Sequence, residues 1–122
     1  MSFVTSLETV SSARYRDGMA CLAGAVNIVT TDGAGGRAGF TASAVCSVTD
    51  TPPTLLVCVN ESSSAGPIFA LNEAICINTV SGVHEDLAML FGGRTPMDER
   101  FTAAHWRVGA SGAPVLLDSL VS

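Results

Sequence analysis

The chain alternates short apolar segments, rich in β-branched residues, with turns of glycine, proline and polar residues. This alternation is typical of short strands joined by tight connections. It predicts strands over residues 25–31, 39–48, 55–59 and 74–80, and a last one over 114–120. The Asp32–Gly36 turn is expected to join the first two strands into a hairpin. Between Arg94 and the last strand the pattern predicts loop.

Helices are predicted at three places. Thr5-Ser6-Leu7-Glu8 has capping-box spacing and begins a helix over about 5–22. Pro67 suits the first turn of a helix over 67–72, and residues 84–91 form a short amphipathic helix that Gly92-Gly93 ends. A doubly wound sheet needs long helices between its strands, which this pattern lacks. The expected class is therefore mainly β or α+β, built round a barrel or a strongly bent sheet.

With 122 residues, the chain fits one domain, 1–122, that buries its own core. It has six arginines, no lysine and eleven acidic residues, for a net charge of −5. Because phosphate contacts need a basic face, no nucleic-acid partner is expected. The lack of lysine excludes a Walker A lysine and a pyridoxal-phosphate Schiff base. With 48% hydrophobic and 14% charged residues, an apolar subunit interface is expected.

The four cysteines, Cys21, Cys46, Cys58 and Cys76, form no CxxC pair and lie in apolar stretches. This pattern predicts reduced thiols buried in the core. The beginning of the chain lacks a basic segment followed by an apolar one, and no apolar run approaches the ~20 residues of a membrane span. Together these features predict a cytoplasmic protein that does not interact with a membrane.

Several motifs that can carry chemistry have a plainer interpretation here. Gly33–Ala38 matches G-x-G-x-x-A, but a strand pattern follows it, so a hairpin turn is expected rather than a dinucleotide site. His84–Asp86, with His105 further on, lacks metal-ligand spacing; a solvated helix start and no metal are expected. Ser111 lies outside a nucleophile-elbow motif. Trp106 is expected to anchor a core or an interface.

Two clusters of small hydroxyl residues are the strongest candidates for a binding site. One is Thr41-Ala42-Ser43 with Ser47, and the other is Ser62-Ser63-Ser64 after Asn60. Hydroxyls and backbone N–H groups at a strand end and an adjacent loop can hold a phosphate without lysine. Ordinary turn chemistry explains the same residues, since Ser and Asn favour loops. Composition alone leaves both interpretations open.

Several segments together resemble a known family. They are RDGMA (16–20), AVNIVTT (25–31), GFTASAVCSVTDTPP (39–53), CINTV (76–80), FGGRTPM (91–97) and ERF (99–101). Over about Arg14 to Ser122 the chain resembles the short-chain flavin reductases, the small partners of two-component flavin monooxygenases. It is most similar to the reductase components for 4-hydroxyphenylacetate hydroxylation and pyrimidine degradation.

The resemblance implies a split β-barrel fold with short peripheral helices, in a homodimer that takes FMN or FAD. Hydride would come from NADH or NADPH, and the reduced flavin would diffuse to a separate monooxygenase. Because the flavin carries the redox chemistry, no catalytic side chain is expected. Family members continue beyond this sequence with a Gly-Asp-His or Gly-Thr-His element that helps to bind nicotinamide. The domain is therefore expected to lack C-terminal strands.

The resemblance also implies which residues contact the flavin. The flavin ring and ribityl chain would lie near Thr41, Ala42 and Ser43, with Ser47 on the following turn, and the ring would be flanked by Val57 and Cys58. The phosphate end would be held by Asn60, Ser62, Ser63 and Ser64. The segment that closes over it would be Phe91, Gly92 and Gly93. Two alternatives remain open. One is a flavin-binding or dimerising module without turnover, and the other is a split-barrel oxidase with tightly held FMN, which the missing lysine disfavours.

Overall fold

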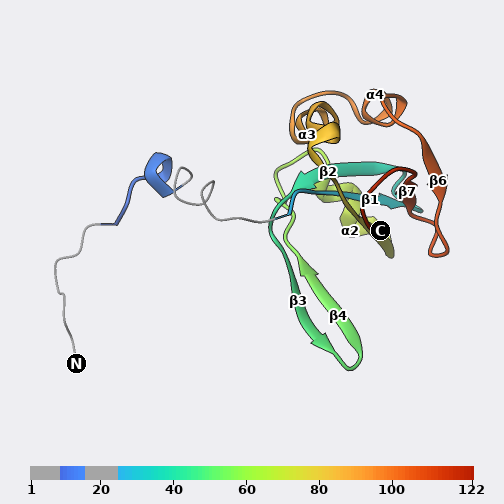
Figure 1. Ribbon diagram of the computed structural model, residues 1–122, viewed down its shortest axis with the longest axis horizontal. Coiled ribbons are helices and arrows are strands. Elements are labelled where there is room, and N and C mark those ends of the chain that lie inside the picture. Colours follow the sequence, from blue (N-terminus) through green and yellow to red (C-terminus); the bar gives the residue numbers. More distant parts are fainter. Residues whose placement is uncertain (1–8, 16–24) are drawn as a thin grey trace.

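The computed structural model describes residues 9–15 and 25–122 (Figure 1). Of the helix predicted over 5–22, residues 12–15 are helical, and most of the remainder lies outside the described residues. Cys21 and the 16–20 segment of the family resemblance also lie outside them.

The central sheet has three antiparallel strands in the order β2-β1-β5. These are β1 (Asn27–Asp32), β2 (Ala38–Ala42) and β5 (Ala74–Thr79). In β1, five of the six residues are buried, which accounts for its continuous β-branched sequence. The predicted bounds of β1 and β5 are right to within two residues, and β2 begins within one residue of its predicted start.

The turn between β1 and β2 is a hairpin turn, as predicted. Gly36 N donates a hydrogen bond of 3.0 Å to Gly33 O. Gly33 and Gly36 have φ values of 152° and 92°, which favour glycine over residues with a Cβ. The G-x-G-x-x-A motif therefore joins two strands and opens no helix.

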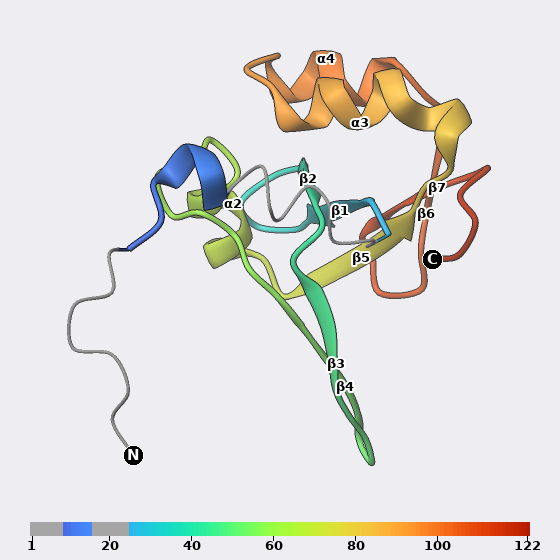
Figure 2. The same cartoon turned by 60° about the vertical axis from the view of Figure 1, so that its left-hand side comes forward.

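A second pair of strands, β3 (Val45–Asp50) and β4 (Pro53–Val57), forms a hairpin that projects from the rest of the fold (Figures 1 and 2). The prediction of one strand over 39–48 is wrong, because the chain leaves the central sheet at Ser43. There Val45 N donates to Ser43 O at 3.0 Å, and β3 then pairs with β4. The continuous apolar pattern gave no sign of this break.

The helices are short and peripheral. They are α2 (Gly66–Leu71), the 3₁₀ helix η1 (Gly82–His84), α3 (Glu85–Gly92) and α4 (Met97–Thr102). The helices predicted over 67–72 and 84–91 are confirmed, apart from η1 at the start of the second. Figure 2 shows α3 and α4 side by side.

The prediction of loop beyond Arg94 is wrong. Besides α4, this part of the chain forms β6 (Trp106–Val108), which pairs with β7 (Pro114–Leu116). The predicted strand over 114–120 is thus shorter, although Thr79 and Val121 form a further bridge. α4 buries only Arg100 and Phe101, so its sequence has too few apolar positions to show helical periodicity.

The core lies between the central sheet, α3 and α4. Its buried members are Ile28, Val80, Leu87, Phe91, Phe101 and Leu116. Trp106 packs against them, and its Nε1 donates to Phe101 O at 3.0 Å, which confirms it as a core anchor. Antiparallel sheets with short peripheral helices confirm the expected class.

The described cysteines are free, but their predicted burial is wrong for two of them. Cys46 and Cys58 are exposed, and Cys76 in β5 is half-buried. Cys46 belongs to the projecting hairpin and Cys58 directly follows it, so neither reaches the core. An apolar sequence around a cysteine does not distinguish a core strand from a projecting one.

Candidate functional site

A polar cavity of about 480 Å³ lies between the end of β2, the loop after β4 and the C-terminal end of α3. It gathers most of the residues predicted to bind flavin. These are Thr41, Asn60, Ser62, Ser63, Ser64, Phe91, Gly92 and Gly93. Arg94 and Arg100 also line it, and none of its described lining residues is acidic. In a chain with a net charge of −5, this concentration of cations favours an anionic ligand.

The loop over residues 60–66 is held by its own hydrogen bonds. Asn60 Oδ1 accepts from Ser62 N at 3.0 Å and from Ser62 Oγ at 2.8 Å. Ser63 Oγ donates to Asn60 O at 2.7 Å. A Cβ at Gly66 would lie 2.8 Å from the carbonyl oxygens of Asn60 and Glu61, so the loop requires glycine there. Turn chemistry thus accounts for Asn60, Ser62 and Ser63.

Ser64 differs from the two serines before it. It is exposed and lines the cavity, and among the described residues its hydroxyl has no hydrogen-bond partner. Its O–H can therefore be donated to a ligand. The two interpretations of this loop are compatible, because a rigid turn presents Ser64 to the cavity.

Thr41, near the end of β2, connects the sheet to α3. Its Oγ1 donates to Ala88 O, which leaves the hydroxyl oxygen as an acceptor toward the cavity. A Cβ at Gly92 would lie 3.6 Å from Thr41 Cβ, so the end of α3 packs closely on this residue. Thr41 and Gly92 also line a neighbouring, largely apolar cavity of about 680 Å³.

Arg100 forms a nearly buried part of the cavity wall. It is 3% exposed, and its guanidinium donates to backbone carbonyls of β2, of the end of α3 and of the turn that follows. Burial lowers the pKa of this guanidinium. The sequence pattern alone did not single out Arg94 and Arg100 as site residues. The signal available was that two of the six arginines of this lysine-free chain lie in the short stretch from residue 94 to 100.

The ring of Phe91 has a mainly structural environment. The residue is buried, and its ring packs edge-on against Phe101 with centroids 5.2 Å apart. A Cβ at Gly39 would lie 2.6 Å from Phe91 Cε2, so this packing depends on that glycine. Toward a ligand, this segment therefore offers mainly the backbone of Gly92 and Gly93.

The remaining predicted residues lie outside the polar cavity. Val57 lines a third cavity, of about 530 Å³, which adjoins the polar one at Phe40. Ala42 is buried in β2, and Ser43 and Cys58 are exposed near the base of the β3–β4 hairpin. Ser47 lies along that hairpin. The sequence gave no reason to select Phe40, whose ring packs edge-on against Phe69 at 5.1 Å.

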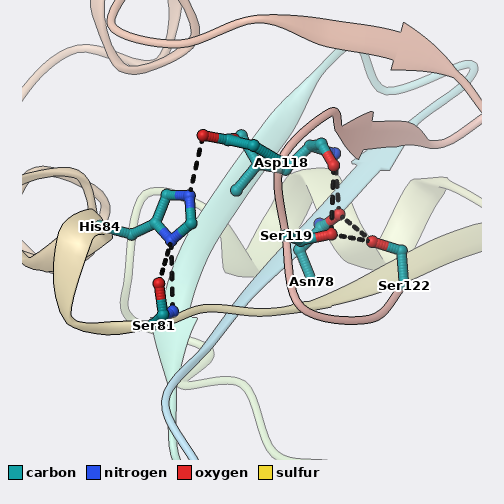
Figure 3. Close-up of polar contacts among 7 residues, drawn as sticks. Asn78, Ser81, His84, Asp118, Ser119 and Ser122 are labelled. Atoms are coloured by element: carbon teal, nitrogen blue, oxygen red, sulfur yellow. Dashed lines mark hydrogen bonds and ion pairs between the residues drawn. The ribbon is translucent and has the colours of Figure 1, made fainter.

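His84 is a structural residue in this fold. It is buried, so the predicted solvated helix start is wrong for it, although Glu85 and Asp86 are exposed. Its Nδ1 accepts from Ser81 N at 3.2 Å, and its Nε2 lies 3.2 Å from Asp118 Oδ2 (Figure 3). In residues 9–15 and 25–122, no three His, Cys, Asp or Glu residues are grouped as metal ligands. Within the same residues, no helix has the length and apolarity that crossing a bilayer requires.

Comparison with known proteins assigns the chain to a family. Residues 19–122 match the family described as flavin reductase like domain, and the chain belongs to this family. It is 61% identical over 113 residues to the FMN reductase (NADH) RutF of Pantoea ananatis, a match that covers 93% of this chain and 60% of that protein. The chain thus spans about three fifths of the length of this relative.

Solved structures agree with this assignment. A Haemophilus somnus protein assigned as a flavin reductase matches with a TM-score of 0.85 and 46% identity, over 91% of this chain and 71% of that one. BorF, the flavin reductase component of a bacterial two-component tryptophan halogenase, matches with a TM-score of 0.78 and 27% identity, over 90% of this chain and 70% of that one. The fold is that of flavin reductases.

Proposed function

We propose that this protein transfers hydride from NADH or NADPH to free FMN or FAD and supplies the reduced flavin to a separate monooxygenase. One observation carries the proposal: the polar cavity holds Arg94, Arg100 and Ser64, and no acidic side chain among its described residues. Such a lining suits the phosphate of a flavin nucleotide. The RutF relative is named an FMN reductase (NADH), and BorF is named a component of a two-component system.

In this proposal the polar cavity takes the phosphate end of the flavin. Ser64 and the backbone of Gly92 and Gly93 face the phosphate, and Asn60, Ser62 and Ser63 keep the loop rigid. Thr41 accepts a hydrogen bond from the ligand, because its own proton is donated to Ala88 O. The ring side extends toward Val57, in the adjoining apolar cavity. Ala42 ends β2, Ser43 and Cys58 lie near the base of the β3–β4 hairpin, and Ser47 lies along that hairpin.

The protein needs no catalytic side chain for this reaction. The flavin supplies the hydride acceptor, and the chain's residues bind it, orient it and limit access of water. Because no lysine is present and the serines are neutral, flavin binding is expected to be weak enough for release after reduction. A sub-nanomolar dissociation constant for FMN would contradict this part of the proposal and favour an oxidase that retains FMN.

Two further features belong to the same proposal. The chain over 1–122 acts as one flavin reductase-like domain in a homodimer, with the β3–β4 hairpin at the interface. Val48, Leu55 and Leu56 on this hairpin are 60%, 48% and 51% exposed, which is costly for an apolar arm that stays in water. The free thiols of Cys46, Cys58 and Cys76 support a cytoplasmic, reducing location.

NADH oxidation, followed by absorbance with FMN, with FAD and without flavin, tests the proposal directly. Oxidation that depends on added flavin is expected. Flavin binding without oxidation of NADH or NADPH would instead indicate a binding module. A Ser64→Ala variant is expected to raise the KM for FMN severalfold with little change in kcat, because Ser64 contacts only the non-reacting end. Ser119→Ala, which removes a hydroxyl outside the cavity, is the control.

A further inference from the structure

Arg100 is a buried cation that no carboxylate balances within the described residues. Its side chain is 3% exposed, and among the described residues no Asp or Glu carboxylate forms an ion pair with its guanidinium. Burial alone accounts for the lowered pKa of the guanidinium, with no charged neighbour contributing. A guanidinium stays protonated in proteins. Arg100 therefore holds a full positive charge among backbone dipoles.

Those dipoles are four carbonyl groups from three parts of the chain. Nε donates to Thr95 O at 2.7 Å, Nη1 to Gly39 O at 2.8 Å and to Phe91 O at 3.3 Å, and Nη2 to Gly93 O at 2.9 Å. A guanidinium has five N–H groups, so one N–H on Nη2 has no acceptor among the described residues. Carbonyl dipoles stabilise the cation without neutralising its charge.

The position of this charge matters because Arg100 lines the polar cavity. Phe91 and Gly93, whose carbonyl oxygens Arg100 binds, also line it. Without Arg100, the negative ends of these carbonyl dipoles would repel an anion in the cavity. Their hydrogen bonds to Arg100 compensate this negative charge. Arg100 thus removes negative potential from the wall and adds positive potential to it, in a medium that strengthens both effects.

We propose that Arg100 is the positioning residue that makes this cavity select flavins with a phosphate group over riboflavin. This inference rests on the proposed function, because it names the substrate class of the same cavity. Riboflavin has the same ring and ribityl chain as FMN and lacks only the phosphate. The ratio of the FMN affinity to the riboflavin affinity therefore separates the contribution of the Arg100 charge from that of the shape of the cavity.

The test measures dissociation constants for FMN and riboflavin by flavin fluorescence, with the wild type, Arg100→Gln and Arg100→Lys. In Arg100→Gln the FMN affinity is expected to fall on the order of tenfold to a hundredfold more than the riboflavin affinity, as for loss of a charge-assisted contact. Arg100→Lys cannot bind four carbonyls but keeps the positive charge. Because the charge is kept, this variant is expected to retain most of the FMN preference. Arg107→Gln, on exposed β6, removes the same charge away from the cavity and serves as the control.

Two results would overturn the inference. In a purely structural role, Arg100→Gln would weaken FMN and riboflavin equally. If Arg107→Gln lowered the FMN preference as much as Arg100→Gln, the effect would come from net charge. Failure of the proposed function itself would look different from either result. The wild type would then bind neither FMN nor riboflavin, or it would keep its FMN preference but fail to oxidise NADH.

A measurement on the wild type keeps the test decisive if Arg100→Gln does not fold. Salt screens exposed charges much more than buried ones, so a preference due to Arg100 is expected to persist at high salt. Inorganic phosphate is expected to compete with FMN and not with riboflavin. A preference that disappears at moderate salt would assign it to exposed Arg94 and overturn the role of Arg100.

Discussion

Two groups of antiparallel strands in this protein have similar apolar sequences and opposite surroundings. In the central sheet, β1 buries five of its six residues, whereas in the hairpin β3 exposes five of six and β4 four of five. The buried strand is covered by β7 and α3, while the hairpin projects alone (Figure 1). Apolar side chains left in water are unfavourable, and among the described residues those of the hairpin are mostly exposed.

The largest expected difference between the two regions is in the cost of removing a side chain. Ile28→Ala in β1, where the side chain is 0% exposed, is expected to lower the free energy of unfolding by about 2–5 kcal/mol. Leu56→Ala, on half-exposed β4, is expected to change it by about 0.5 kcal/mol or less in the monomer. Urea unfolding at low protein concentration measures both. Equal losses would mean that the hairpin is packed as tightly as the sheet.

The central sheet also contains buried polar groups, which the hairpin lacks among its described residues. Asn78 donates to Ile28 O at 2.9 Å and accepts from Leu116 N at 2.9 Å. It also accepts from Ser122 Oγ at 3.0 Å (Figure 3). Asn78→Ala leaves buried groups without partners and is expected to cost about 2 kcal/mol or more. Asn72→Ala, directly after α2, removes two hydrogen bonds to the β1–β2 turn from a less buried residue; it is the control and is expected to cost less. A cost for Asn78→Ala no greater than for the control would show that water reaches this network.

The exposed apolar residues of the β3–β4 hairpin are where the proposed homodimer would form. If the proposed homodimer forms through the hairpin, Leu56→Glu is expected to weaken it at least about tenfold, because a carboxylate would be buried in an apolar interface. Sedimentation velocity over a range of concentrations gives the dissociation constant. Val83→Glu, at a residue 87% exposed outside the hairpin, is the control. A dimer unchanged by Leu56→Glu would place the interface elsewhere.

The smallest expected effect concerns the thiols. Burial raises the pKa of Cys76, so at a given pH less of it is the reactive thiolate. In variants that keep one cysteine each, alkylation of Cys76 is expected to be several times slower than that of exposed Cys46 or Cys58, and its rate to rise at a higher pH. Mass spectrometry over time measures each rate. Equal rates would mean that the Cys76 thiol on β5 becomes accessible to the reagent as readily as the exposed thiols of Cys46 and Cys58.

The sequence predicted most elements because their patterns are local. Strands β1, β4 and β5, the β1–β2 turn and helices α2 and α3 follow from β-branched runs, glycines and helix-start residues. It missed the break at Ser43, α4 and β6. In each case the deciding contacts are long-range: β3 pairs with β4, Phe101 packs on Phe91, and Trp106 lies opposite Leu116.

The site was predictable in part. Thr41 and the serine loop were selected first as hydroxyl clusters and then, with Gly92-Gly93, from the family resemblance, and the fold brings them to one cavity. Arg100 was not, because an arginine in a polar helix such as MDERFT is usually solvated. Its burial depends on carbonyl groups of Gly39, Phe91 and Gly93, which only the folded chain brings together.

The sequence by itself determined the class of the fold, the positions of most strands and a cavity chemistry without lysine, because these depend on local pattern and on residue type. Only the tertiary structure decided which apolar strand is buried, which loop hydroxyl is free for a ligand and where an unbalanced cation lies. Burial and hydrogen bonding depend on neighbours distant in sequence. Val57 and Val29 have the same side chain, yet one ends a projecting hairpin and the other lies in the core.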